Sequence, residues 1–123
     1  MTPTQPAALS QEQLRQVNTR IRLTPREQLA MKRAFAEVLP SPAEVYLYGS
    51  RTDRNAAGGD IDLLIHLPGV AFEQELELSA ALLGALEAAL GERKIDLLFT
   101  PTLGADAKAF VRLVEPNAVR LFP

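Results

Sequence analysis

The sequence predicts one α/β domain in which helices cover a single mixed sheet. Short runs of β-forming residues alternate with longer segments of helical periodicity, and Gly or Pro residues separate them. The chain has 123 residues, of which 47% are hydrophobic. A chain of this size buries roughly two thirds of the surface that its unfolded form exposes, which is enough for one core.

Two helices are predicted before the first strand. Residues 1–7 contain two prolines and are expected to be disordered. Ser10-x-x-Gln13 is a capping pattern for a short helix over 11–18. Thr24-Pro25-Arg26-Glu27 is a stronger signal, with a capping threonine, a proline at the first helical position and a glutamate at the third. It predicts a helix over 25–39.

Turn residues delimit the remaining elements. We predict strands over 44–48, 60–67 and 94–99, a turn leading into a short helix over 50–57, and helices over 72–90 and 104–115. A short apolar tail over 118–122 is a further candidate strand. The helix over 72–90 is apolar on more than one side, which indicates core contacts or an interface. We expect an N-terminal extension over 1–23 and a domain over 24–123. If the second apolar side of this helix is an interface, it could join two copies of the chain.

Charge is unevenly distributed along the chain. The formal net charge is −2, but residues 1–33 carry +4 and the remainder carries −6. A basic segment on an acidic body suits RNA or an acidic partner, but a solvated helix surface is the simpler and favoured explanation. The pI near 5.4 argues against direct nucleic-acid binding as the main role.

Composition also bears on location and metal chemistry. No apolar run is long enough to span a bilayer, and the N-terminus has no apolar signal core, so we expect a cytoplasmic protein without membrane contact. The absence of cysteine excludes disulfides and thiolate metal sites. Any metal site must therefore use oxygen or imidazole ligands.

Three aspartates stand where strands would normally carry apolar residues. Asp60 and Asp62 open the second predicted strand, and Asp96 lies near the start of the third. Residues two apart on a strand share a face, so these carboxylates converge if the two strands are neighbours. At about 5 Å and an effective dielectric near 20, each pair repels by roughly 3 kcal/mol. Such a cluster takes up a proton or a cation, and all-oxygen ligands suit Mg²⁺ or Mn²⁺.

Gly49, Ser50 and Arg51 follow the first strand directly. Glycine lets a phosphate approach the backbone, and a serine at a helix start offers its hydroxyl and amide to an anion. Arg51 adds a guanidinium that could neutralise phosphate charge. An anion cradle beside a divalent-metal cluster is the combination that a nucleoside triphosphate needs.

Gly49-Ser50, nine intervening residues, Asp60-x-Asp62 and a later strand aspartate together resemble the nucleotidyltransferase superfamily of DNA polymerase β. Within it, the chain is most similar to the minimal nucleotidyltransferases, which are often encoded beside a HEPN-domain partner. The resemblance covers about residues 24–100, and the nine-residue spacer is short for the family. It implies a palm-like mixed-sheet fold, with Gly49 and Ser50 on the triphosphate of ATP.

The same resemblance implies that Asp60 and Asp62 hold Mg²⁺, with Mn²⁺ as a substitute. Asp96 would be the third carboxylate and the base for the incoming hydroxyl. Three functions remain open from the sequence. The one that we expect is transfer of AMP from ATP to a hydroxyl on a partner protein, a HEPN toxin, because Gly49-Ser50 and all three aspartates are present. The others are an antitoxin that neutralises a HEPN ribonuclease by occlusion, and a small-molecule nucleotidyltransferase completed by dimerisation.

Overall fold

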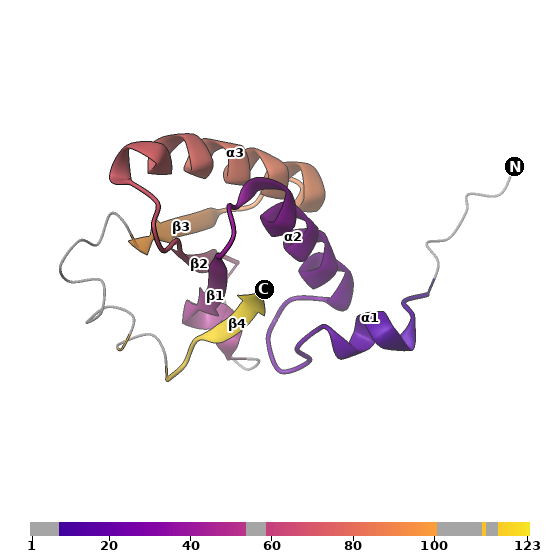
Figure 1. The fold of residues 1–123 in the computed structure, drawn as a ribbon. Coiled ribbons are helices and arrows are strands. Elements are labelled where there is room, and N and C mark those ends of the chain that lie inside the picture. Colours follow the sequence, from indigo (N-terminus) through magenta and orange to yellow (C-terminus); the bar gives the residue numbers. More distant parts are fainter. Residues whose placement is uncertain (1–7, 54–58, 101–111, 113–115) are drawn as a thin grey trace, which may run out of the picture.

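A four-stranded mixed sheet with two long helices on one face forms the centre of the molecule (Figure 1). The computed structural model describes residues 8–53, 59–100, 112 and 116–123. The elements in chain order are α1 (Gln11–Arg15), α2 (Pro25–Val38), β1 (Glu44–Tyr48), the 3₁₀ helix η1 (Gly49–Thr52), β2 (Ile61–His66), α3 (Phe72–Leu90), β3 (Ile95–Phe99) and β4 (Val119–Phe122). The predicted α/β class with a mixed sheet is confirmed.

The strands lie in the order β3-β2-β1-β4. The central strand β1 pairs antiparallel with both β2 and β4, whereas β2 and β3 are parallel. The parallel pair is joined through α3, the crossover helix that such a connection requires. The two aspartate-bearing strands are therefore neighbours, which is the condition under which their carboxylates were expected to converge.

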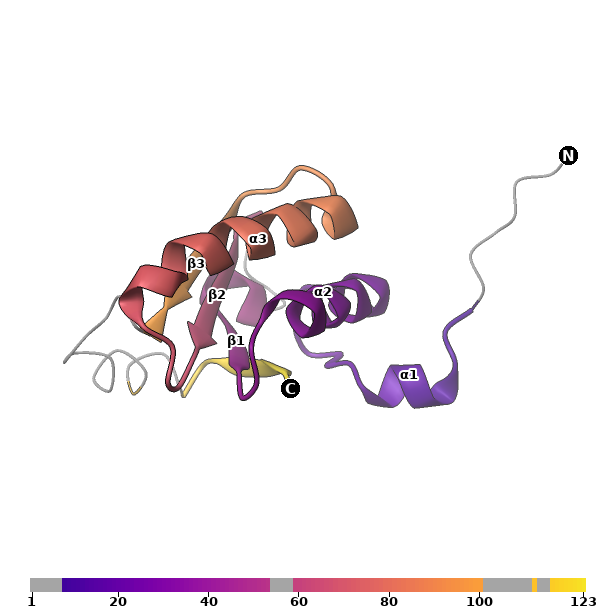
Figure 2. The same cartoon turned by 45° about the horizontal axis from the view of Figure 1, so that its top comes forward.

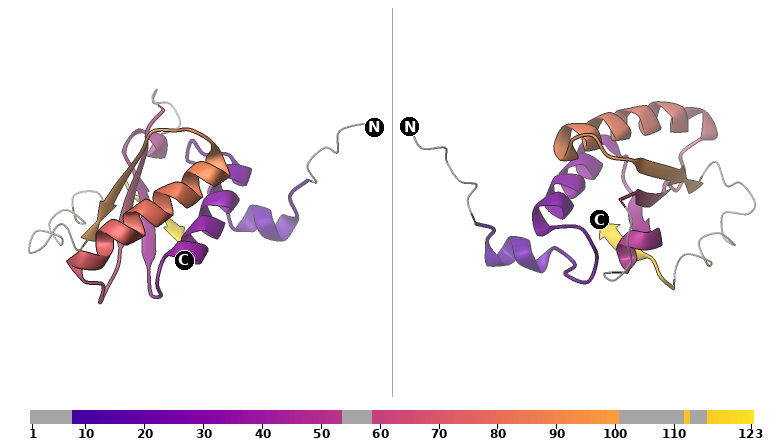
Figure 3. Two further views of the ribbon diagram at one scale, coloured as in Figure 1. Left: turned by 90° about the horizontal axis from the view of Figure 1, so that it is seen from above. Right: turned by 180° about the vertical axis from the view of Figure 1, so that it is seen from behind.

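Helices α2 and α3 pack on the same face of the sheet (Figures 2 and 3). The residues of β2 that face them, Ile61, Leu63 and Ile65, have no exposed surface. Phe35 and Met31 of α2 are equally buried, and the Phe35 ring meets Phe122 of β4 edge to face at 5.7 Å between centroids. The core thus lies between the sheet and these two helices.

The predicted helix signals act as expected in both N-terminal helices. The Thr24 hydroxyl accepts from the backbone N–H of Glu27, whose carboxylate accepts from the Thr24 N–H. Ser10 and Gln13 form the same reciprocal box at α1. That helix ends at Arg15, shorter than the predicted 11–18. It has no buried residue, so packing does not extend it.

Several predicted boundaries shift by one or more residues. The second strand begins at Ile61 rather than at residue 60, so Asp60 precedes the strand. The third and fourth strands each begin one residue later than predicted. The predicted disorder of 1–7 and the predicted helix over 104–115 lie outside the described residues, apart from Arg112. The predicted turn and short helix over 50–57 corresponds to the 3₁₀ helix η1, which ends at Thr52, and residues 54–58 lie outside the described residues.

The face of the sheet away from the helices has an apolar centre that sequence reasoning did not predict. Leu64 is 1% exposed although it alternates with residues that face the helices. In the sheet register it lies between Tyr46 of β1 and Leu98 of β3. This row lies next to the polar end of the same face, where Asp62 is found. Among the described residues, no helix is both long and apolar enough to cross a membrane.

The segment between α1 and α2 is fastened to the domain by one buried side chain. Gln28 of α2 is 1% exposed. Its Nε2 donates to the carbonyl oxygens of Asn18 and Leu23 at 2.7 and 2.9 Å, and its Oε1 accepts from the Asn18 N–H at 2.8 Å. Ile21 and Leu23 are both buried in the core. The segment before residue 24 thus contributes to the core, while the division into 1–23 and 24–123 stays a prediction.

We expect Gln28→Ala to lower the free energy of unfolding by roughly 2–4 kcal/mol. The change removes three hydrogen bonds and leaves buried backbone groups unpaired. Urea unfolding followed by circular dichroism measures it. The control is Gln74→Ala at an exposed position in the first turn of α3, where the side chain accepts a single hydrogen bond from the Ala71 N–H, and it should lose about 1 kcal/mol or less. Equal losses in the two variants would contradict the role given to Gln28.

Candidate active site at the ends of β1 and β2

Asp62 and Asp96 are direct neighbours across the parallel pair β2 and β3. Ile61, Leu63 and Ile65 face the core, so alternation directs Asp62 to the face away from α2 and α3. The register pairs Asp62 with Asp96 and, on the other side, with Tyr48. Two of the three predicted carboxylates are therefore brought together as expected.

The electrostatics of this pair favour a proton or a cation. Burial raises the pKa of the Asp62 carboxyl, and the charge of Asp96, a hydrogen bond with Asp96 and the charge of Asp60 raise it further, while Lys94 partly offsets this. Burial also raises the pKa of Tyr48, with the charges of Asp62 and Asp96 adding to the effect. Both pKa shifts thus come first from burial and then from the negative charge of the neighbouring carboxylates.

Asp60 takes a different position from the other two carboxylates. Its Oδ2 lies 3.3 Å from Nζ of Lys94, in an ion pair that is largely exposed. The backbone ties the same two positions together, since the Ile61 N–H donates to the Lys94 carbonyl at 3.0 Å. Within the described part of the chain, no group of three or more His, Asp or Glu side chains is arranged to hold a metal ion. Asp60 thus acts on Asp62 through its charge but is paired with a lysine.

Gly49 brings the turn after β1 against the Asp62 carboxylate. Its φ is +79°, a region that residues with a Cβ rarely adopt. A methyl group built on Gly49 would overlap Oδ2 of Asp62 and lie 3.3 Å from its Cγ. Only glycine therefore allows the backbone of this turn and the carboxylate of the next strand to lie so close.

Ser50 is the second residue of the 3₁₀ turn, and it has an arginine beside it that sequence reasoning missed. Nη2 of Arg22 lies 3.5 Å from Oγ of Ser50, and Nε of the same side chain donates to the Asp53 carbonyl at 3.1 Å. In the sequence, Arg22 was one of several basic residues in the N-terminal segment. Its position depends on a contact across 28 residues, for which a single sequence offers no signal.

Arg51 is used within the loop rather than directed at Ser50. Its Nη1 donates to the Arg22 carbonyl at 2.7 Å, and its Nη2 donates to the Gly59 carbonyl at 2.8 Å. The Arg22 N–H in turn donates to the Arg51 carbonyl at 2.9 Å. Nε of Arg51 is buried without a hydrogen-bond partner among the described residues. The predicted phosphate contact of Arg51 stays a prediction, and its described hydrogen bonds fasten the turn to two other segments.

One comparison with known proteins identifies a family. The sequence model of the family described as "Nucleotidyltransferase domain" matches residues 30–115, which is more than half of the chain. The match includes the Gly49-Ser50 turn and all three aspartates, while Arg22 lies before it. No curated protein matches the sequence.

We expect Gly49→Ala to cost more stability than a glycine change at an open turn. Gly69→Ala is the matched control, because Gly69 has φ +81° and nothing lies within 4 Å of the added carbon. The control should lose roughly 1–2 kcal/mol for the backbone conformation alone. Gly49→Ala should lose more, because it also displaces Asp62. Chemical denaturation measures both, and a loss no greater than that of Gly69→Ala would contradict the contact.

We expect Asp62→Asn to stabilise the protein in metal-free buffer near neutral pH. The raised pKa means that the folded state binds this proton more tightly than the unfolded chain, so stability falls as pH rises from the usual aspartate value through the folded pKa. The asparagine variant avoids that loss. Its advantage in melting temperature should be present at about pH 7.5 and shrink towards about pH 3.

The control for this pH dependence is Glu37→Gln on the exposed side of α2. It removes one carboxylate away from the aspartates and should show little change across the same pH range. A gain for Asp62→Asn that is as large at the acid end as at neutral pH would contradict the electrostatic explanation.

Proposed function

The chain belongs to the nucleotidyltransferase domain family, and we propose that it transfers AMP from ATP to a hydroxyl group on a partner protein. The partner we propose is a HEPN toxin, which makes the chain the antitoxin of a toxin–antitoxin pair in the cytoplasm. Transfer of a nucleotidyl group from a nucleoside triphosphate is the activity of the family. The base, the acceptor and the partner are the proposed details.

The contact between Gly49 and Asp62 is the observation on which this proposal rests. It places the start of a 3₁₀ turn, with its backbone and the Ser50 hydroxyl, against a carboxylate that is paired with a second carboxylate. The two carboxylates would repel an anion bound at this turn unless a cation lies between the anion and the carboxylates. A triphosphate carrying a divalent cation satisfies both groups at once.

The donor set fits Mg²⁺ or Mn²⁺ in its chemistry. Asp62 and Asp96 offer only carboxylate oxygens, and the raised pKa of Asp62 indicates a site that favours added positive charge. Asp60 would complete the set by exchanging Lys94 for the metal, and exposed ion pairs of this kind are weak. When bound, the divalent cation neutralises phosphate charge and polarises the α-phosphate.

The remaining roles follow from position. Gly49 and the Ser50 hydroxyl hold the β- and γ-phosphates, with Arg22 supplying positive charge next to Ser50. Arg51 shapes the turn. The acceptor oxygen forms a bond to the α-phosphorus as the bond from phosphorus to the pyrophosphate oxygen breaks. Asp96 takes the proton of the acceptor hydroxyl, and pyrophosphate leaves.

Two considerations support a protein as the acceptor. The resemblance to the minimal nucleotidyltransferases, which are often encoded beside a HEPN-domain partner, favours this class. In addition, Asp62 and Asp96 lie on the sheet face opposite to α2 and α3, so neither helix obstructs an incoming chain segment (Figures 2 and 3). A bulky anion attached to a tyrosine, serine or threonine of a ribonuclease would oppose RNA by charge and size.

We expect the partner to carry AMP after co-expression with the wild-type protein. Intact-mass spectrometry of the purified HEPN partner measures an added nucleotide directly. The variant with Asp60, Asp62 and Asp96 all changed to Asn should leave the partner unmodified and should fail to protect cells. Lys94→Gln serves as the nearby control, because it removes the ion pair with Asp60 and leaves all three carboxylates.

The same experiment separates catalysis from occlusion. If the partner carries no nucleotide and the triple variant protects cells as well as the wild type, the chain neutralises its partner by binding alone. A partner that is neither modified nor bound would contradict the choice of partner. Labelled ATP with the purified chain would then be used to test other acceptors.

A further inference from the structure

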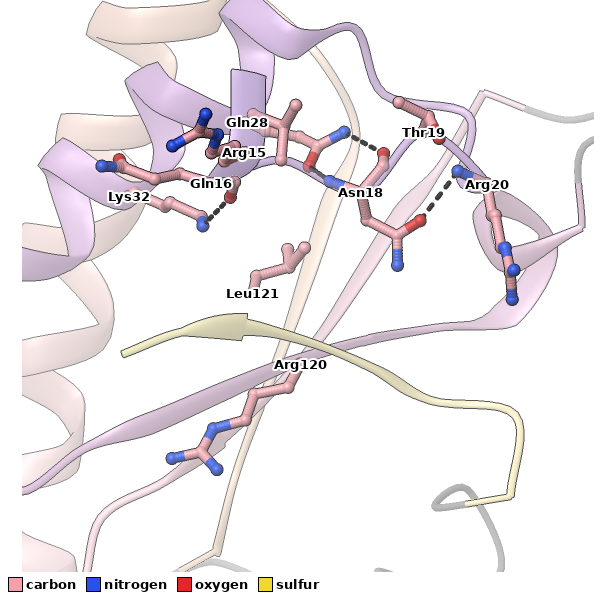
Figure 4. A pocket seen from close by; sticks show the side chains of 10 residues that line it. Arg15, Gln16, Asn18, Thr19, Arg20, Gln28, Lys32, Arg120 and Leu121 are labelled. Carbon is pink, nitrogen blue, oxygen red and sulfur yellow. Dashed lines mark hydrogen bonds between the residues drawn. The ribbon is translucent and has the colours of Figure 1, made fainter. Parts of the chain in front are cut away.

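A cavity of about 390 Å³ lies between the segment after α1, helix α2 and strand β4 (Figure 4). None of its lining residues belongs to the Gly49–Arg51 turn, and none is one of the three aspartates. Figure 4 shows Lys32 and Arg15 at one end, Asn18 and Arg20 at the other, and Leu121 between them. This cavity is therefore separate from the candidate active site.

The cavity has fixed walls. Gln28 holds Asn18 through two hydrogen bonds of 2.7 and 2.8 Å (Figure 4). The Asn18 Oδ1 accepts from the Arg20 N–H at 2.7 Å, and Lys32 donates to the Gln16 carbonyl. Leu121, 3% exposed, forms the floor from β4. These contacts fix the Lys32 side chain, the Asn18 side chain and the backbone of Arg20 at the wall of one space.

The charge around the cavity is positive, and none of the described residues that line it is acidic. Arg15 is paired loosely with Glu12 at 3.7 Å, with both side chains largely exposed. Arg120 turns away from the cavity in Figure 4 and pairs with Glu44 at 3.6 Å. Among the described residues, Lys32 and Arg20 form no ion pair.

The polar groups at the wall are mainly donors. Lys32 has no described partner other than a backbone carbonyl, and burial lowers its pKa, so a bound anion would relieve an unfavourable charge. The side-chain oxygen Oδ1 of Asn18 already accepts a hydrogen bond from the Arg20 N–H, which leaves the side-chain nitrogen Nδ2 as a donor. Figure 4 shows this nitrogen on the side of Asn18 that faces β4. Ammonium, guanidinium and amide donors around one space suit the oxygens of a phosphate group.

We propose that this cavity is a second anion site, which binds a small phosphate-bearing ligand such as pyrophosphate or a mononucleotide between Lys32, Arg20 and Asn18. The small ligand is favoured over a long polyanion because the chain carries a net charge of −2 and the basic residues gather in one concave site. The site needs no divalent cation, because its charges are already positive.

Isothermal titration calorimetry with inorganic pyrophosphate and with AMP, both in EDTA, tests the proposal. Binding should weaken with added salt, and Lys32→Gln should weaken it at least about tenfold, the loss expected for one charge-assisted hydrogen bond. Arg33→Gln is the matched control, because Arg33 is the next residue on α2, exposed and outside the cavity. It should leave the affinity within about twofold.

Two further variants keep the result separate from the proposed activity. Ser50→Ala should leave metal-free binding of pyrophosphate unchanged, while Arg20→Gln should weaken it as Lys32→Gln does. Thermal melts check that every variant is folded. Absence of binding, or equal affinity in Lys32→Gln and Arg33→Gln, overturns the proposal. A short RNA that binds through Lys32 more tightly than pyrophosphate overturns the choice of a small ligand.

Discussion

The parallel pairing of β2 with β3 sets the carboxylates of Asp62 and Asp96 side by side, where they repel each other. The groups around them reflect this repulsion. Asp62 is partly buried, so its charge is less well screened than that of a surface residue, and its pKa is raised. The next strand contributes Tyr48, whose pKa is raised by burial and by the same charges. The turn after it contributes a glycine, because any side chain there would overlap the carboxylate. The candidate active site is thus an electrostatically unfavourable arrangement that the packing of the hydrophobic core holds in place.

That core explains why the strands cannot relieve the repulsion by sliding. Ile61, Leu63 and Ile65 have no exposed surface, and a shift of one residue would turn all three away from the helices. Burial of each such side chain is worth roughly 1.5–3 kcal/mol, so the register outweighs the cost of one close carboxylate pair. Lys94 moderates the local charge through Asp60 without separating Asp62 from Asp96.

The parts of this arrangement that sequence could predict are those that depend on near neighbours. Capping residues predicted α2 closely, and the alternation of Asp62 with apolar residues predicted the buried face and the position of Asp62 on the opposite face. The same alternation around Asp96 predicted its strand phase. These signals lie within a few residues of each other, where backbone geometry alone decides which side chains share a face.

The parts that sequence could not predict depend on contacts between distant segments. Arg22 reaches Ser50 across 28 residues, and Gln28 binds the backbone of a segment ten residues earlier. Leu64 is buried on the same face as Asp62, and its neighbours across the sheet, Tyr46 and Leu98, are distant in the sequence. Asp60 precedes the strand, so its expected face could not be taken from strand periodicity.

The reciprocal hydrogen bonds between Arg22 and Arg51 have a consequence for where this protein can be cut. The family match begins at residue 30, yet Ile21 and Leu23 lie in the core and the Arg22 backbone is hydrogen-bonded to Arg51 in the turn after β1. A recombinant fragment trimmed to the matched residues would retain Asp60, Asp62 and Asp96. It would lose Arg22, whose hydrogen bonds support the turn that carries Gly49 and Ser50. The segment that the family model matches is therefore shorter than the segment that the folded domain needs.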